Sequence, residues 1–252
     1  MRADKEWLWF AGGKHPVVRD FFTAGRDHPM FRAFHEWVER GYEAFAATGN
    51  HRPKPCLWRF WATGPMKHGL VCGLIKDSSD LLGRPYPLLV MGTGPLEGWE
   101  DHWDLIAFAC ETTWTHLEYF SSKTHRNLGD LAEYLESTRP PEPRWNEWVK
   151  SRDALLHGDS FEGPQRLGAD DKPPGTELEG SRNGKEILVP LRTDIPGELS
   201  ETIQFLLGRL KAQRIPYPSA VFLGGSPEQS YLASFADALG TKDFLRLWAV
   251  CA

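Results

Sequence analysis

Tryptophan is concentrated in the first part of this chain, and one segment turns that concentration into a strong constraint on the fold. Eleven tryptophans are present, and ten of them precede residue 150. Between Trp99 and Phe120, large apolar side chains recur every three or four residues, which predicts a helix with one broad aromatic stripe. Such a stripe must be covered by other elements, so we expect it to form core rather than a cofactor pocket.

Shorter apolar runs predict the other elements. Branched or aromatic runs bounded by glycine and proline predict strands, and apolar residues at intervals of three or four predict helices. The predicted strands cover 7–11, 56–63, 70–76, 86–91, 186–191, 219–223 and 229–235, and the further predicted helices cover about 29–45, 128–135, 145–156, 194–213 and 242–250. Asp27 precedes the first of these helices and is predicted to be its N-cap.

The order of these elements indicates the fold class. A four-residue connection, 64–67, predicts that the second and third strands form a hairpin, and regular βαβ winding fits less well. We therefore expect an α+β fold, an α/β sandwich in which helices cover a mixed, mainly antiparallel sheet. We expect a single domain over 1–252, with an aromatic-rich part over 1–140, a mobile loop over 157–184, and strands and helices over 185–252 that complete the fold.

Charge and composition exclude several classes of function. The 252 residues include 29 Lys+Arg and 34 Asp+Glu, a net charge of −5, which argues against a general nucleic-acid binder. The first residues lack the apolar stretch of a signal peptide, and no window has the roughly 20 apolar residues of a membrane span. We expect a cytoplasmic protein without membrane insertion, in which Cys56, Cys72, Cys110 and Cys251 are small buried thiols rather than disulfides.

Motifs for catalysis, metals and cofactors are weak in this sequence. No two of the nine histidines lie three or four residues apart, so the helical zinc arrangement is absent. The turn 92–98 resembles a dinucleotide-binding loop, but Glu97 stands where its third glycine belongs. The G-x-S-x-G nucleophile motif is also absent. We therefore predict no catalytic residue, no metal and no cofactor.

Two polar clusters, over 13–22 and 77–88, are unusual for plain turns because glycine, proline and apolar residues closely flank their charges. The candidate site residues are Lys14, Asp20, Ser79, Asp80 and Arg84. We expect four of them (Lys14, Asp20, Asp80 and Arg84) to lie close together in one ion-paired network that fixes two loops, since buried charges persist when they are paired. Such a network either contacts a partner or only supports the loops.

These clusters resemble the two signatures of a bacterial protein family, the type VI secretion-associated TagF proteins, also called ImpM. The first signature is a strand followed by G-K-x-P-x-x-G-D-F, and the second is S-x-D-x-x-G-R-x-(Y/F)-P-L. The matching residues are Gly13, Lys14, Pro16, Asp20 and Phe21, then Ser78 or Ser79, Asp80, Gly83, Arg84, Tyr86, Pro87 and Leu88. Arg19 stands where the family usually has glycine. The likeness covers about 7–137 and resumes near 216.

The resemblance implies a function that the motifs alone do not. It implies a non-enzymatic cytoplasmic accessory protein of a type VI secretion system, which represses firing post-translationally by binding other proteins. The partners it implies are secretion components, among them a forkhead-associated scaffold protein. The residues leave two alternatives open: an enzyme that acts on a phosphorylated partner through an unrecognised tertiary active site, and a small-ligand-binding protein. A pocket with strongly perturbed titratable groups would favour the first, and a deep cavity lined by the aromatic stripe would favour the second.

Overall fold

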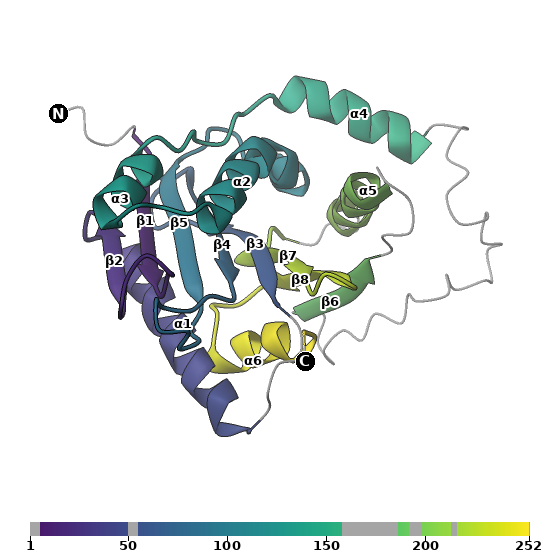
Figure 1. Ribbon diagram of the computed structural model, residues 1–252. Helices are drawn as coiled ribbons and strands as arrows, with labels where there is room; N and C mark the ends of the chain where they lie inside the picture. Colours follow the sequence, from purple (N-terminus) through teal and green to yellow (C-terminus); the bar gives the residue numbers. More distant parts are fainter. Residues whose placement is uncertain (1–5, 50–54, 158–185, 192–197, 213–215, 252) are drawn as a thin grey trace.

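One antiparallel sheet of eight strands forms the centre of the molecule (Figure 1). The computed structural model describes residues 6–49, 55–157, 186–191, 198–212 and 216–251. The strands are β1 (Leu8–Gly13), β2 (Phe22–Gly25), β3 (Leu57–Thr63), β4 (Gly69–Lys76), β5 (Leu88–Pro95), β6 (Glu186–Leu191), β7 (Ala220–Gly225) and β8 (Ser230–Phe235). Their order is β2-β1-β5-β4-β3-β7-β8-β6. The predicted α+β class is confirmed, and every pairing between these strands is antiparallel.

The pairing of β3 with β7 joins the first and last parts of the chain in one sheet. In this pairing Phe60 of β3 lies opposite Phe222 of β7. On its other side β3 pairs with β4, as the predicted hairpin requires. The single domain over 1–252 stays a prediction, because all but the first residue of the predicted loop 157–184 lie outside the described residues.

Helices cover both faces of the sheet (Figure 1). They are α1 (Pro29–Ala47), α2 (Ile106–Ser122), α3 (Leu128–Glu136), α4 (Trp145–His157), α5 (Glu198–Ala212) and α6 (Thr241–Ala249). One face carries α1 and α6, which pack against each other, and the other carries α2 and α3, with α4 and α5 beyond α2. Side chains alternate along each strand, so that Trp61 of β3 enters the α2 core while Phe60 enters the α1 core.

The aromatic stripe between Trp99 and Phe120 is buried core, as predicted, but it does not lie on one continuous helix. Trp114 is 1% exposed, and its Nε1 donates a hydrogen bond to the Phe60 carbonyl over 3.3 Å. Gly98 has a left-handed backbone (φ 78°), turns follow it, and a 3₁₀ turn over Trp103–Leu105 precedes α2. In the described part of the chain, no helix is both long enough and apolar enough to cross a membrane.

The N-cap of α1 is His28, so the prediction of Asp27 was wrong by one residue. His28 has an extended backbone, and its Nδ1 accepts a hydrogen bond from the Met30 amide over 3.2 Å. Pro29 follows at the first helical position, where its missing amide hydrogen costs nothing. Asp27 instead lies 3.3 Å from the Arg32 guanidinium on the surface.

Strand β5 continues beyond the end predicted for it at Gly92. A Cβ atom on Gly92 would lie 2.4 Å from the Trp9 ring, and one on Gly94 would lie 2.6 Å from the Trp7 ring. The two indole rings therefore occupy the space that side chains of β5 would fill. These glycines are needed for aromatic packing, and the turn that resembles a dinucleotide-binding loop is mostly strand.

Two of the four cysteines differ from the prediction of free buried thiols. Cys56 and Cys251 are joined by a disulfide between Cα atoms 5.8 Å apart. They lie 195 residues apart in the sequence, so their proximity depends on the completed sheet and the helix α6. Cys72 and Cys110 are free and buried, as predicted.

Candidate functional site

Two loops that are far apart in the sequence lie together at one end of the sheet. Loop 14–21 joins β1 to β2, and loop 77–87 joins β4 to β5; together they form what we call the two-loop site. Because β1 and β5 are neighbours, with Gly13 opposite Leu88, the loops start side by side. Gly13 is left-handed (φ 112°), and a Cβ atom there would lie 2.1 Å from the Pro87 carbonyl oxygen. Glycine therefore permits the close approach.

The centre of the two-loop site is an ion pair between Lys14 and Asp80. Lys14 Nζ lies 3.1 Å from Asp80 Oδ2, and the two side chains are 8% and 0% exposed. The other carboxylate oxygen, Oδ1, accepts hydrogen bonds from the Leu82 and Arg84 amides over 2.9 and 3.0 Å. Both oxygens of the buried carboxylate are therefore satisfied by donors from the two loops.

The surroundings of Asp80 keep it ionised. Burial would raise the pKa of the Asp80 carboxyl, but hydrogen bonds from the Arg84 amide, Lys14 and the Arg84 guanidinium outweigh it and lower that pKa to about 2. A carboxylate that is ionised, buried and fully hydrogen-bonded holds structure together. It is poorly suited to act as a general base, which must have a free lone pair within reach of a substrate.

Arg84 connects the central ion pair to the opposite loop. Its Nε donates to Asp80 Oδ2 over 2.7 Å, and its Nη2 donates to the Arg19 carbonyl over 2.6 Å. The same Nη2 lies 3.6 Å from Asp20 Oδ1 at the surface. The structure thus brings Lys14, Asp20, Asp80 and Arg84 together in one chain of ion pairs.

Backbone hydrogen bonds shape loop 77–87 into a compact tip. Ser79 and Pro85 form an isolated antiparallel bridge, which places this predicted site residue at the base of the tip. Gly83, in a left-handed conformation (φ 76°), donates its amide to the Asp80 carbonyl over 2.9 Å. The tip contacts the other loop where the Leu81 amide donates to the Val18 carbonyl over 2.7 Å.

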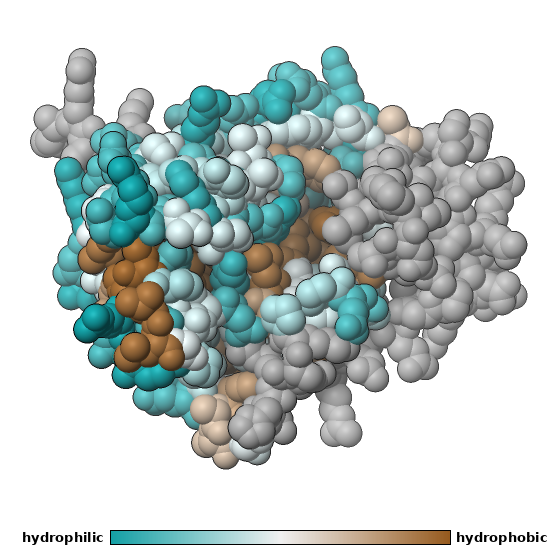
Figure 2. Space-filling model, in the orientation of Figure 1, coloured by the Kyte–Doolittle hydropathy of each residue, from teal (hydrophilic) through white to brown (hydrophobic). Residues whose placement is uncertain are grey.

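The outer surface of the two-loop site is apolar. Phe21, Leu81 and Leu82 are 57%, 57% and 66% exposed. Figure 2 shows a brown patch of apolar side chains at the left of the molecule, over the region where the β1–β2 and β4–β5 loops lie in Figure 1. Phe21, Leu81 and Leu82 belong to a small set of large apolar side chains that are exposed in the described residues, the others being Met66, Tyr119, Leu128 and Tyr217. Sequence reasoning missed Leu81 and Leu82, because a leucine pair beside a motif gives no sign of its exposure.

Aromatic rings support the exposed Phe21. Its ring packs edge-on against Tyr86 at 4.7 Å between centroids, and Tyr86 packs in turn against Tyr42 of α1 at 5.0 Å. Lys14 Nζ lies 4.9 Å from the centre of the Phe21 ring. Burial, followed by the charges of Glu39 and Glu43, raises the pKa of Tyr86, so its hydroxyl stays neutral.

Two histidine rings, His15 of loop 14–21 and His125, pack against each other. His15 is 3% exposed, its Nδ1 accepts a hydrogen bond from the Val17 amide over 3.2 Å, and its ring lies 5.4 Å from that of His125. Burial, with His125 and Lys76 as smaller contributions, lowers the pKa of His15 to about 4. Neither imidazole is grouped with two further ligands, and no cluster of three His, Cys, Asp or Glu in the described residues is arranged to hold a metal.

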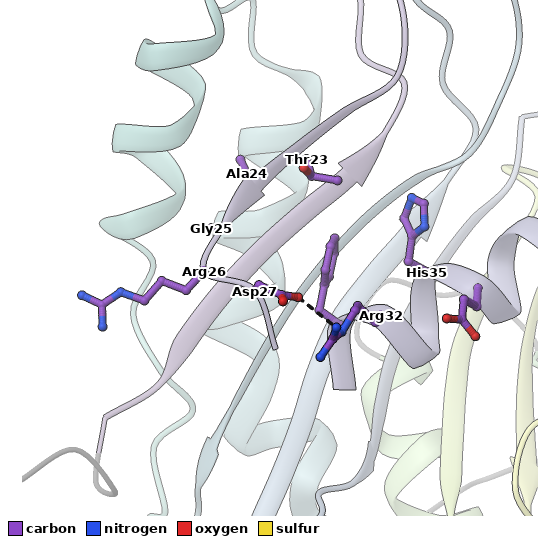
Figure 3. A pocket seen from close by; sticks show the side chains of 9 residues that line it. Thr23, Ala24, Gly25, Arg26, Asp27, Arg32 and His35 are labelled. Atoms are coloured by element: carbon purple, nitrogen blue, oxygen red, sulfur yellow. Dashed lines mark ion pairs between the residues drawn. The ribbon is translucent and has the colours of Figure 1, made fainter. Parts of the chain in front are cut away.

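Two surface pockets lie away from the two-loop site. One, of about 370 Å³, lies between β2 and α1 and is lined by Thr23, Gly25, Phe31 and His35 among others (Figure 3). The other, of about 270 Å³, lies between the start of α1 and the ends of β3 and β7. Both are lined from α1 and not from the aromatic stripe that a small-ligand pocket was expected to use.

Comparison with protein-family models identifies the class of protein to which the chain belongs. Residues 10–137 match a family model described as the TagF N-terminal domain, type VI secretion system-associated. The chain therefore belongs to the TagF family. Both loops of the two-loop site lie within the matched residues.

Comparison with solved structures supports the fold. The crystal structure of PA0076 from Pseudomonas aeruginosa PAO1 matches with a TM-score of 0.53 at 14% sequence identity, over 96% of this chain and 93% of that chain. At this identity the match shows a shared fold and nothing about activity. A search of curated proteins finds no match.

Proposed function

We propose that the protein is a cytoplasmic regulator of a type VI secretion system that represses firing post-translationally by binding a component of the apparatus. The observation that carries the proposal is the exposed pair Leu81 and Leu82, at 57% and 66%, on a tip fixed by the buried ion pair of Lys14 and Asp80. Exposed apolar side chains on a rigid loop are typical of a docking surface. Membership of the TagF family supplies the link to secretion.

The buried ion pair contributes to binding by fixing the tip in advance. Ordering a loop during association costs free energy, and a loop already held by its own hydrogen bonds avoids that cost. Asp80 accepts hydrogen bonds from its own tip (Leu82 and Arg84) and pairs with Lys14 of the other loop, so both loops are held before a partner arrives. Repression then depends on occupancy, and the copy number and affinity of the protein set the response.

The partner that the family resemblance favours is a forkhead-associated scaffold protein. The two-loop site offers such a protein an apolar contact at Leu81 and Leu82, bordered by the half-exposed Arg84 and the exposed Asp20. A complementary surface would carry an apolar recess and polar groups around it. The proposal includes no catalytic step, since the donors around the Asp80 carboxylate leave it no role in proton transfer.

The test is secretion activity in the source bacterium after deletion of the gene and complementation with variants. The test variant is Leu81→Ser/Leu82→Ser, and the matched control is Met66→Ser, since Met66 is 54% exposed on the β3–β4 turn away from the site. We expect deletion to raise secretion, wild type and Met66→Ser to lower it again, and the double variant to leave it high at an equal protein level. Full repression by the double variant would overturn the proposal.

A further inference from the structure

Strand β2 is an outermost strand of the sheet. It pairs only with β1, through four residue positions from Phe22 to Gly25, and no strand lies on its outer side in the part of the chain that the structure describes. The outer edge of such a strand presents backbone N–H and C=O groups that can pair with another strand. Natural edge strands are usually protected from pairing with another chain. We therefore ask which residues flank β2 and with what kind of strand they could pair.

The charges around β2 are arranged for antiparallel pairing of this segment with itself. Residues 19–27 read Arg-Asp-Phe-Phe-Thr-Ala-Gly-Arg-Asp. When two copies pair antiparallel with Thr23 opposite Thr23, the residues that flank β2 on either side also fall into register: Arg19 of one copy is level with Asp27 of the other, and Asp20 is level with Arg26. The two-fold axis repeats each contact, which gives four opposite-charge pairs, and opposite charges across strands are stabilising. Registers centred on Phe22 or on Ala24 do not give these pairs.

The faces of β2 agree with the same register. Phe22 and Ala24 pack against the α2 core, and the pocket beside α1 is lined by Thr23 and Gly25 together with Ala24. Residues directly opposite each other in an antiparallel pair lie on the same face of the sheet. A register centred on Thr23, like any register centred on one residue, pairs odd numbers with odd numbers and even with even, so every residue meets a partner on its own face, and the charges are what favour Thr23 as the centre. It also places Phe21 opposite Gly25, where an aromatic ring can cover a glycine.

The four charges are available for such contacts. All four are exposed, and Asp20 and Asp27 have side-chain exposures of 69% and 73%. Asp20 accepts a hydrogen bond from the Phe21 amide over 2.9 Å and lies 3.6 Å from Arg84, and Asp27 lies 3.3 Å from Arg32; the two ion pairs are long, lie at the surface, contribute little and can be shared. In Figure 3 the Arg26 side chain extends away from the Asp27–Arg32 pair.

We propose that the protein forms a two-fold dimer in which β2 pairs antiparallel with β2 of a second copy, centred on Thr23, so that the sheets of the two copies become continuous. The inference goes beyond the proposed function, because Leu81 and Leu82 take no part in it. A ladder of about five residues is short, so the dimer is of modest affinity and is to be studied over about 1 to 200 µM.

A charge exchange tests this register at constant composition. Arg26→Asp/Asp27→Arg converts all four pairs from opposite to like charges without changing net charge. We expect the dissociation constant, measured by sedimentation equilibrium, to rise by at least about tenfold. Adding Arg19→Asp/Asp20→Arg to the same chain makes the pairs opposite again and is expected to restore the dimer. A monomeric wild type at about 200 µM, or a dimer that is unchanged by the first exchange, would overturn the proposal.

Cross-linking gives a second, independent test of the register. Opposite residues in an antiparallel pair have Cα atoms about 4.5 to 5.5 Å apart, which suits a disulfide. Thr23→Cys is therefore expected to form a covalent dimer under mild oxidation. The matched control is Glu36→Cys, an exposed position on α1 that lines the same pocket but lies outside the pairing. No cross-link through Thr23→Cys, or equal cross-linking through Glu36→Cys, would contradict the proposed interface.

Discussion

Lys14 and Asp80 form an ion pair that is shielded from solvent at both ends. Nζ lies 3.1 Å from Oδ2, with side-chain exposures of 8% and 0%, although the two residues are separated by three strands in sequence. Removing one member of a buried pair leaves the other charge without compensation, and this is far more costly than losing a surface pair. The pair therefore fixes the relative position of loops 14–21 and 77–87.

The first prediction concerns the stability of the two-loop site. Lys14→Met leaves the Asp80 carboxylate buried beside one fewer cation, and we expect it to lower the melting temperature by about 10 °C. Asp20→Asn removes only a surface contact at 3.6 Å and is expected to change it by less than about 2 °C. In a double-mutant cycle, the variant Lys14→Met/Asp80→Asn is expected to lose less unfolding free energy than the sum of the losses in the two single variants. Strict additivity would contradict the ion pair.

The second prediction is that acidification lowers stability in two steps. The pKa of His15 is about 4 in the folded protein against an ordinary value of 6.5, so only the unfolded chain binds that proton in between. The contribution of the neutral His15 side chain to the unfolding free energy is complete above pH 6.5 and is lost as the pH falls toward 4. The pKa of Asp80 is about 2 against 3.8, so its contribution is lost between these values.

Urea unfolding across this pH range measures both steps. His15 can contribute up to about 1.4 kcal/mol per pH unit to the slope of the unfolding free energy between pH 6.5 and 4. His15→Gln has no imidazole to protonate and is expected to flatten that part of the curve. The slope below pH 3.8 should persist in this variant, because it arises from carboxyl groups whose pKa is lowered in the folded protein, Asp80 and Asp130. An unchanged slope between pH 6.5 and 4 in His15→Gln would contradict the assignment.

The third prediction concerns the packing of α4 and α5. Asp104, which is 0% exposed, accepts hydrogen bonds from Arg152 of α4 over 2.8 Å and from Lys211 of α5 over 2.6 Å. Asp104→Ala leaves two cations without their shared partner, and we expect a loss of about 3 kcal/mol in unfolding free energy. Hydrogen exchange should increase over 145–157 and 198–212. Asp153→Asn, which alters the half-exposed partner of Arg152, is the control and should change both quantities little.

The fourth prediction concerns the disulfide between Cys56 and Cys251. It closes a segment of 195 residues, and chain entropy gives such a link about 5 kcal/mol of stabilisation. Reduction, or Cys56→Ser/Cys251→Ser, is expected to lower the melting temperature by several degrees or more. Titration of the denatured, unreduced protein should find two free thiols, those of Cys72 and Cys110. Four free thiols in protein purified without reductant would contradict the link.

The sequence predicted the positions of the helices and strands better than the contacts between them. Periodicity located the aromatic core and every described strand except β2, because burial on one face leaves a regular pattern in the residues. It also placed α2 inside a longer predicted helix, since the pattern continues through the turns that follow Gly98. The end of β5 was missed because Trp9 of β1 and Trp7, which directly precedes β1, fill the space over its glycines.

The sequence predicted which charged residues form the candidate site, but it did not predict which apolar side chains of the site are exposed. The charged residues stood out because glycine and proline flank them, and the structure places Lys14 3.1 Å and Arg84 2.7 Å from the Asp80 carboxylate. The exposure of Leu81 and Leu82 depends on how the tip folds back through the Ser79–Pro85 bridge, which local sequence does not encode. The disulfide was missed for a similar reason, since its cysteines meet only in the completed sheet.

The most direct test of the central claim is affinity capture from the source bacterium with tagged wild type, Leu81→Ser/Leu82→Ser and Met66→Ser, compared at equal amounts of folded protein. The account predicts that wild type and Met66→Ser retain secretion-system components, a forkhead-associated scaffold among them, and that the double variant loses them. Equal retention by all three proteins would contradict docking through the two-loop site. Retention of none by wild type would contradict the proposal that the protein regulates secretion by binding the apparatus.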